Sequence, residues 1–150
     1  MARTLRIRIK RMREAHDFPL PAYRSAGAAG LDLFAAIEKQ QLLAPNARLA
    51  IPCGVAIALP KGYEAQIRPD WTLASLHGVT VINSPGTIDS DFRGEVSVLL
   101  INLGSESIAI QRGMCVAQMV VKEVPRIKLL EVSELPSSSR SSGGFGHTGK

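Results

Sequence analysis

A chain of 150 residues can bury about 70% of the surface that its unfolded form exposes, which predicts one domain. The formal net charge is +5, no apolar run approaches the roughly 20 residues that cross a bilayer, and no signal segment opens the chain. We therefore expect a soluble cytoplasmic protein without a membrane partner. Cys53 and Cys115 lie far apart without CxxC spacing, which argues against a disulfide framework and a zinc knuckle.

The first element in the chain is a predicted strand over residues 5–10, where apolar and basic side chains alternate as on a strand with one wet face. Runs rich in apolar and β-branched residues predict further strands over residues 48–59, 63–68, 79–83, 95–102, 107–110, 115–121 and 126–131. Turn signals such as Lys61-Gly62 and Arg112-Gly113 separate these runs, as in an antiparallel barrel or sandwich. The fold class is thus all-β, with one short helix predicted near residues 73–76.

Composition changes after Glu134, where the chain becomes rich in serine and then in glycine. We therefore divide the chain into a β-barrel domain over residues 1–134 and a flexible C-terminal arm over residues 135–150. Most such tails are disordered termini, because they have almost nothing to bury. This one ends in the patterned sequence GGFGHTG, which favours an ordered state in the presence of a ligand.

Several functional classes fit the sequence poorly. The basic first strand could bind nucleic acid, yet aromatic residues are only 5% of the chain and do not interleave with Lys and Arg, so we expect no nucleic-acid partner. The three histidines, His16, His77 and His147, lack metal-ligand spacing, and there is no GxSxG motif. A glycine-framed hairpin over residues 85–95 remains as a candidate site, although its aspartates could serve turn geometry alone.

Five separated stretches resemble, in order and spacing, the five motifs of the trimeric dUTPase (deoxyuridine 5'-triphosphate nucleotidohydrolase) family. They are AGLDLFAA (29–36), RPDWTLASLHGV (68–79), INSPGTIDSDFRGE (82–95), RGMCVAQMV (112–120) and the tail from Arg140 through GGFGHTGK. Each motif alone is weak, but the ordered set is specific and spans nearly the whole chain. The dCTP deaminase family shares the fold, but the third motif and the tail favour dUTPases.

The resemblance implies a distorted jelly-roll β-barrel that forms a homotrimer, with each active site built from three chains. It also implies Mg²⁺-assisted hydrolysis of dUTP to dUMP and pyrophosphate. By position, Asp89 resembles the catalytic carboxylate that deprotonates a water attacking the α-phosphorus, and Asp32 resembles the aspartate that holds waters on the Mg²⁺. The positions that resemble substrate-binding residues are Asn83, Phe92, Gln118, Arg140, Phe145, His147 and Thr148.

These positions have distinct implied roles. Asn83 and the hairpin backbone pair with the uracil edge, Phe92 lies beneath the deoxyribose where the family usually has Tyr, and Gln118 lies near the base. In the tail, Phe145 stacks over uracil, while Arg140, His147 and Thr148 meet the γ-phosphate.

If the family resemblance is set aside, three of these residues have simpler interpretations. Asp32 is then a turn residue after Gly30, Phe92 a core aromatic, and Gln118 an exposed strand residue.

Four residues depart from the family pattern. The second motif usually reads RPRSGLA, whereas here Asp70, Trp71 and Thr72 replace its Arg, Ser and Gly, and Cys115 stands where the fourth motif usually has Arg. Two cations are thus missing beside a triphosphate and one anion is added. A unit charge at ~4 Å and an effective dielectric constant of ~20 is worth ~4 kcal/mol, or roughly 10³ in binding or rate. We expect turnover of dUTP to be severely weakened or absent.

The same departures support a rival hypothesis. Trp71 is the only tryptophan, and burying such a side chain against a partner contributes ~1.5 to 3 kcal/mol. The chain would then be a non-catalytic trimer whose second-motif surface was altered, naturally or by engineering, to hold a second protein or build a larger assembly. Random drift does not explain the pattern, since the tail and Asp89 still match.

Overall fold

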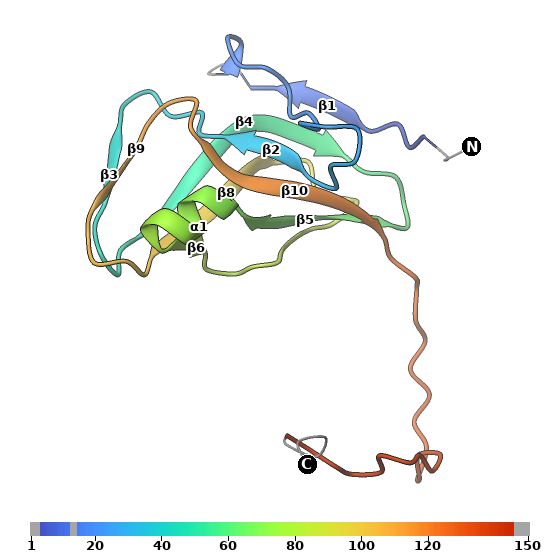
Figure 1. The fold of residues 1–150 in the computed structure, drawn as a ribbon. Coiled ribbons are helices and arrows are strands. Elements are labelled where there is room, and N and C mark those ends of the chain that lie inside the picture. Colours follow the sequence, from blue (N-terminus) through green and yellow to red (C-terminus); the bar gives the residue numbers. More distant parts are fainter. Residues whose placement is uncertain (1–3, 13–14, 146–150) are drawn as a thin grey trace.

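The computed structural model describes residues 4–12 and 15–145, and this part of the chain is mostly strand with one short helix (Figure 1). The helix is α1 (Trp71–His77). The strands are β1 (Arg8–Arg11), β2 (Leu31–Phe34), β3 (Gln41–Leu43), β4 (Arg48–Ala58), β5 (Tyr63–Pro69), β6 (Val79–Val81), β7 (Gly86–Ile88), β8 (Glu95–Asn102), β9 (Ile108–Ile110) and β10 (Cys115–Glu123). The predicted all-β architecture is therefore confirmed.

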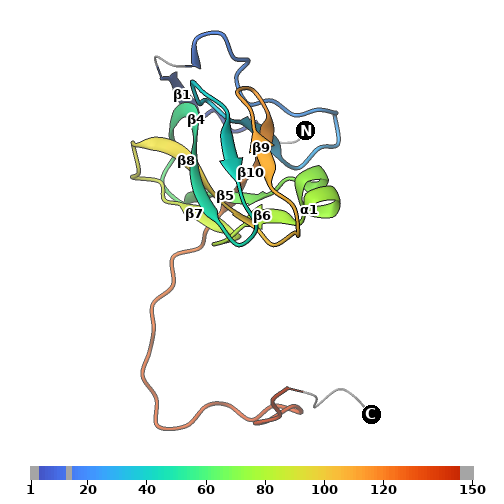
Figure 2. The ribbon, with the colours of Figure 1, turned by 90° about the vertical axis from the view of Figure 1, so that its left-hand side faces the viewer.

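Two four-stranded sheets and one two-stranded sheet make up the fold. Their strand orders are β1-β4-β8-β6, β2-β10-β5-β7 and β3-β9, and all neighbouring strands run antiparallel. Alternating residues of both larger sheets, such as Ile51, Val98, Ile67 and Val116, belong to one buried apolar cluster. The two views in Figures 1 and 2 show the sheets gathered together and α1 beside β6. No helix in the described part of the chain is long and apolar enough to cross a membrane.

Most predicted strands lie where the apolar runs placed them, and the alternation in residues 5–10 is confirmed as exposed basic and half-buried apolar side chains. Strands β2, β3 and β7 were not predicted. Each has only three or four residues, and the turn-forming Pro85 and Gly86 obscure β7.

The strand predicted over residues 126–131 is wrong for the single chain. The whole segment is exposed and has no ladder partner in the described residues. Figures 1 and 2 show the chain leaving the sheets after β10 and running away from them. A strand needs a neighbour to satisfy its backbone, so alternation alone did not suffice.

Helix α1 is longer than predicted because both its ends are capped. Asp70 is the N-cap, and its Oδ1 accepts a hydrogen bond from the backbone N–H of Leu73 at 2.9 Å. Gly78 ends the helix with φ 67, in the left-handed region. A Cβ on Gly78 would lie 2.8 Å from the backbone nitrogen of Gly104. The caps fix where the helix begins and ends within the second motif.

Asn102, the last residue of β8, ties three segments together from a fully buried position. Its Nδ2 donates to the carbonyl oxygens of Leu43 at 3.0 Å and Glu106 at 2.8 Å, and its Oδ1 accepts from the backbone N–H of Gly104 at 2.9 Å. All polar atoms of this amide are thus paired in the interior, where an unpaired group is costly.

We expect Asn102→Ala to lower the free energy of unfolding by about 2 to 4 kcal/mol, because it removes three hydrogen bonds and leaves the buried carbonyl group of Leu43 without this donor. The measurement is urea unfolding at one fixed protein concentration. The control is Gln111→Ala at an exposed position, which should change stability by less than about 0.5 kcal/mol. Equal stability of the two variants would contradict this role of Asn102.

Candidate functional site

Strand β10 brings together residues from the first, second and fourth motifs. It pairs with β2 on one side and β5 on the other, so that Gln118 lies opposite Asp32 in one ladder and opposite Arg68 in the other. Ala117 pairs with Pro69, directly before Asp70. A register shift between Cys115 and Ala117 interrupts the β2 ladder. Residues from three segments that are distant in the sequence therefore meet along one strand.

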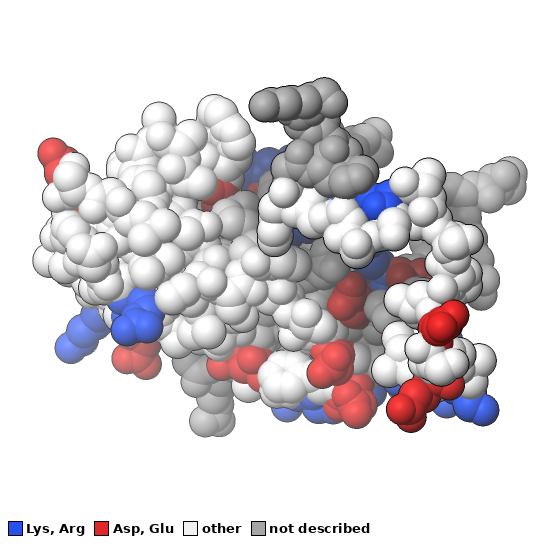
Figure 3. Space-filling view, turned by 90° about the horizontal axis from the view of Figure 1, so that it is seen from below, with Lys and Arg blue, Asp and Glu red and all other residues white. Residues whose placement is uncertain are grey.

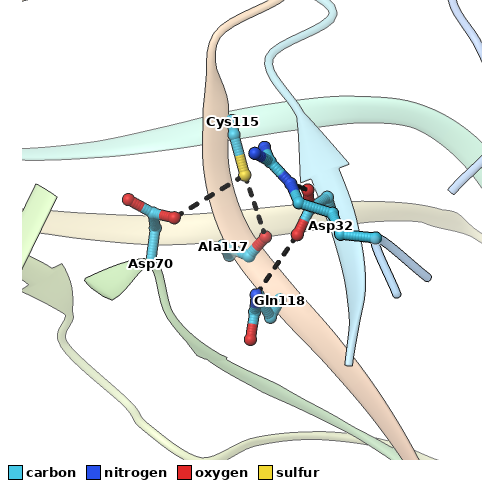
Figure 4. A network of polar contacts seen from close by, with 6 residues as sticks. Asp32, Asp70, Cys115, Ala117 and Gln118 are labelled. Carbon is cyan, nitrogen blue, oxygen red and sulfur yellow. Dashed lines mark hydrogen bonds and ion pairs between the residues drawn. The ribbon is translucent and has the colours of Figure 1, made fainter. Parts of the chain in front are cut away.

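Asp32 is buried, with 3% of its surface exposed, and it has two partners. Arg24 Nε forms an ion pair with its Oδ2, and Gln118 Nε2 donates to its Oδ1 at 3.2 Å (Figure 4). Gly30 allows this contact, since a Cβ there would lie 3.0 Å from Gln118 Oε1. Two simpler interpretations are therefore wrong: Asp32 is a buried strand residue and not a turn residue, and Gln118 is a half-buried partner of Asp32.

Asp70 and Cys115 belong to the same network of polar contacts as Asp32 and Gln118 (Figure 4). Cys115 Sγ is 3.8 Å from Asp70 Oδ2 and 3.7 Å from the carbonyl oxygen of Ala117, and Figure 4 shows the thiol between the two acceptors. Burial, followed by the nearby charges of Asp32 and Asp70, raises the pKa of the Cys115 thiol to about 11. The thiol is therefore neutral near pH 7, where the family usually has a cation.

These side chains surround a cavity of about 410 Å³, which is also lined by Trp71, Thr72 and His77. Among the charged lining residues, two carboxylates, Asp32 and Asp70, face one guanidinium, that of Arg24. The cavity thus carries an excess of negative charge, which disfavours a bare triphosphate.

Arg24 was not predicted from the sequence. It precedes the first motif in a loop without hydrophobic periodicity, so no pattern marks it. Two backbone interactions bring this loop against β2. They are an isolated β-bridge between Tyr23 and Leu31 and a hydrogen bond from the backbone N–H of Asp32 to the carbonyl oxygen of Ala22. Its hydrogen bond and charge interaction with Asp32 raise the pKa of Arg24 above its ordinary value.

Asp89 lies in the exposed hairpin that follows β7, in a different cavity of about 270 Å³ shared with Tyr63, Asp91 and Arg126. Asn83 lines a third cavity of about 70 Å³ with Thr87. A single chain therefore separates Asp89 and Asn83 from the group around Asp32.

Phe92 is exposed, so its interpretation as a core aromatic is wrong for the single chain. Its ring lies over Gly94, where a Cβ would come within 2.7 Å of Phe92 Cζ. The adjoining turn is held by Arg93, whose Nη1 donates to the carbonyl oxygens of Ser90 and Phe92, both at 2.7 Å.

The C-terminal residues lie apart from these cavities. Arg140 Nε donates to the carbonyl oxygen of Gly143 at 3.0 Å, in a local turn, and Phe145 is fully exposed. Figure 1 shows this segment away from the sheets. His147 and Thr148 lie outside the described residues.

The residues around Asp32 fit a hard divalent cation that keeps most of its waters. No group of three or more His, Cys, Asp or Glu side chains within residues 4–12 and 15–145 is arranged to hold a metal, which argues against a protein cage in that region. One buried carboxylate facing a cavity matches the way Mg²⁺ is usually bound, through one or two carboxylates, waters and phosphate oxygens.

A thiol with a pKa of about 11 is almost entirely protonated at pH 8, so we expect Cys115 to react with iodoacetamide about 200-fold more slowly than a free thiol. Asp70→Asn should accelerate the reaction, because it removes an anion that raises the pKa while an asparagine still caps α1. Asp91→Asn is the control and should leave the rate unchanged. Peptide-resolved mass spectrometry measures the rate, and rapid labelling of the unaltered protein would contradict the assignment.

Comparisons of the chain with known proteins point to one family. The family model described as dUTPase matches residues 16–149. The deoxyuridine 5'-triphosphate nucleotidohydrolase of Caldanaerobacter subterraneus subsp. tengcongensis is 50% identical over 143 residues, which cover 95% of this chain and 97% of that protein. The enzyme of the same name from Thermoanaerobacter sp. (strain X514) is 48% identical over the same shares of both chains.

Solved structures agree on the fold. A mutant dUTPase of phage 80alpha superposes with a TM-score of 0.85 at 21% identity, covering 97% of this chain and 100% of that one. A mutant dUTPase of phage phi11 of S. aureus, studied for its coordination of a structural Mg(II) ion, has a TM-score of 0.78 at 18% identity, covering 89% and 100%. From the family match over nearly its whole length and from relatives that share half of its residues, the chain belongs to the dUTPase family.

Proposed function

We propose that this chain is a dUTP nucleotidohydrolase, which converts dUTP and water to dUMP and pyrophosphate, and that its turnover is weakened. The observation that carries the proposal is the hydrogen bond between Asp32 and Gln118 in one cavity, within a chain half identical to enzymes of that name. It joins the first and fourth motifs at a carboxylate of the kind that, with waters and phosphate oxygens, usually holds Mg²⁺.

Asp89 is the proposed general base. Its carboxylate lies in an exposed hairpin at the mouth of a cavity, where it accepts a proton from the water that attacks the α-phosphorus. Asn83 and the hairpin backbone bind the uracil edge, and Phe92 packs against the deoxyribose. Asp32 holds waters of the Mg²⁺, and that ion, when bound, neutralises charge on the triphosphate oxygens.

The proposed enzyme is a homotrimer. In one chain Asp89, Asn83 and Asp32 line three separate cavities, so one complete site needs surfaces from more than one chain. Leu99 of β8, which lines the Asn83 cavity, and Ile82, which directly follows β6, are exposed apolar side chains. Such a face is suited to burial against a second copy.

The C-terminal arm completes the site of another chain. Exposed apolar residues such as Ile127, Leu129 and Leu130 follow β10 and gain burial only against a partner surface. That arrangement carries Arg140, His147 and Thr148 to the γ-phosphate and Phe145 to the uracil ring.

Four residues that line the Asp32 cavity weaken its binding of the triphosphate. Asp70 adds a negative charge and is committed to capping α1, and Cys115 is a neutral thiol in place of a cation. Trp71 and Thr72 add bulk where the family usually has Ser and Gly. The lost and added charges correspond to roughly 10³ in binding or rate.

We expect the combined variant Asp70→Arg, Trp71→Ser, Thr72→Gly, Cys115→Arg to raise kcat/KM for dUTP by about 10³, because it restores two cations beside the triphosphate. Release of pyrophosphate with Mg²⁺ present measures the rate. Asp89→Asn in the same background is the control and should lose activity by about 10² to 10⁴. Rapid hydrolysis by the unaltered chain, with no gain in the variant, would refute the weakening.

A second candidate function is a non-catalytic trimer that holds a second protein or builds a larger assembly through α1. Trp71 is 78% exposed, and Leu76 on the same helix is also exposed. Figure 3 shows a broad uncharged area on the side of the molecule where Figure 1 places α1, β3 and β9. Exposed tryptophan on an uncharged surface is a favoured interface anchor.

If α1 mediates assembly, light scattering at increasing protein concentration should show species larger than a trimer, and Trp71→Ser should remove them. Truncation of an interface anchor typically costs more than about 2 kcal/mol, or about 30-fold in affinity. Val124→Ser, at an exposed apolar position outside α1, is the control for general surface hydrophobicity. A trimer alone at every concentration argues against self-assembly through this helix.

A further inference from the structure

Arg24 and Asp32 form an ion pair in the cavity, and the two side chains have different environments. Asp32 is buried, whereas the Arg24 side chain is 70% exposed on the loop before β2. Next to it, Ser25, Ala26 and Gly27 are exposed, and a Cβ on Gly27 would meet nothing within 4 Å. The carboxylate is therefore held in place by the fold, while the guanidinium has room to leave it.

Arg24 and Gln118 occupy the carboxylate oxygens of Asp32 to which a metal-bound water would donate. Oδ1 of Asp32 accepts from Gln118 at 3.2 Å, and Oδ2 is paired with Arg24 Nε. A hydrated divalent cation at this carboxylate would come close to the guanidinium, and two cations near one carboxylate repel each other. Arg24 is the only Lys or Arg among the residues lining this cavity, so it alone there competes in this way.

We propose that Arg24 is a built-in competitor of the divalent cation at Asp32: its guanidinium holds Oδ2 when no cation is bound and must withdraw before a hydrated cation takes that oxygen. This inference rests on the role proposed above for Asp32. It adds a residue that sets the cation affinity of the site and that precedes the five motifs in the chain.

The expected size of the effect follows from the exposure of Arg24. An exposed charge is screened by water, so the pair is worth far less than a buried one and its loss should change affinity by about threefold to fivefold. Removing Arg24 should tighten cation binding, because Asp32 then carries an uncompensated negative charge. A purely structural role, in which Arg24 positions Asp32 for the metal, predicts weaker binding instead.

The probe is Mn²⁺ alone, added to the full-length protein without nucleotide. Paramagnetic broadening of the backbone amide signals of residues 31–33 reports binding at β2 and separates this site from weak binding elsewhere. The variants are Arg24→Ala and Arg24→Gln, and the matched control is Arg8→Ala, which removes the same charge from a different cavity. Asp32→Asn tests the carboxylate, and thermal melting at matched concentration verifies that each variant is folded.

The inference predicts that both Arg24 variants bind Mn²⁺ about threefold to fivefold more tightly, while Arg8→Ala stays within about twofold of the unaltered chain. Unchanged or weaker binding in the Arg24 variants, with binding still abolished by Asp32→Asn, would overturn the competition and leave the proposed function standing. Undiminished binding in Asp32→Asn would overturn both, because Asp32 would then not be where the cation binds.

Discussion

The position of β10 between β2 and β5 is the constraint on which the candidate site depends. Because this strand has a ladder on each side, residues 86 positions apart, such as Asp32 and Gln118, share a hydrogen bond, and the end of β5 delivers Asp70 to the same place. Core side chains on the opposite face of β10, such as Val116 and Met119, are almost fully buried and hold the register. A shift by one residue would turn Gln118 away from Asp32.

Three features of the single chain bear on the proposal that its site is completed by further copies. Its carboxylates Asp32 and Asp89 line separate cavities, Leu99 of β8 is an exposed apolar side chain, and its last described residues extend away from the sheets. The proposed homotrimer would account for all three features, because each of them needs a partner surface that one chain does not provide. In that proposal the site lies at an interface, and nucleotide binding and ordering of the polar arm would occur together.

The sequence predicted the fold well where apolar runs were long, as in β4 and β8, and poorly where pairing decided the outcome. β7 follows turn-forming residues yet pairs with β5, while residues 126–131 alternate like a strand and have no partner among the described residues. Family resemblance pointed to Asp32 and Gln118, but their contact follows from register. Arg24 carried no pattern at all, since loop closure alone brings it to Asp32. The N-cap role of Asp70 had a recognisable signal, an aspartate directly before a helix, that sequence analysis did not use.

If the proposed function holds, position 70 affects both the stability of α1 and the binding of phosphate. Asp70 anchors the first turn of the helix, and such caps contribute about 1 kcal/mol, whereas arginine has no acceptor with which to cap. Under the proposed function, a cation at this position would hold phosphate better, but it would cap the helix less well. Selection for a sturdier scaffold and selection for faster turnover would therefore choose different residues at position 70, and this chain has the residue that favours the scaffold.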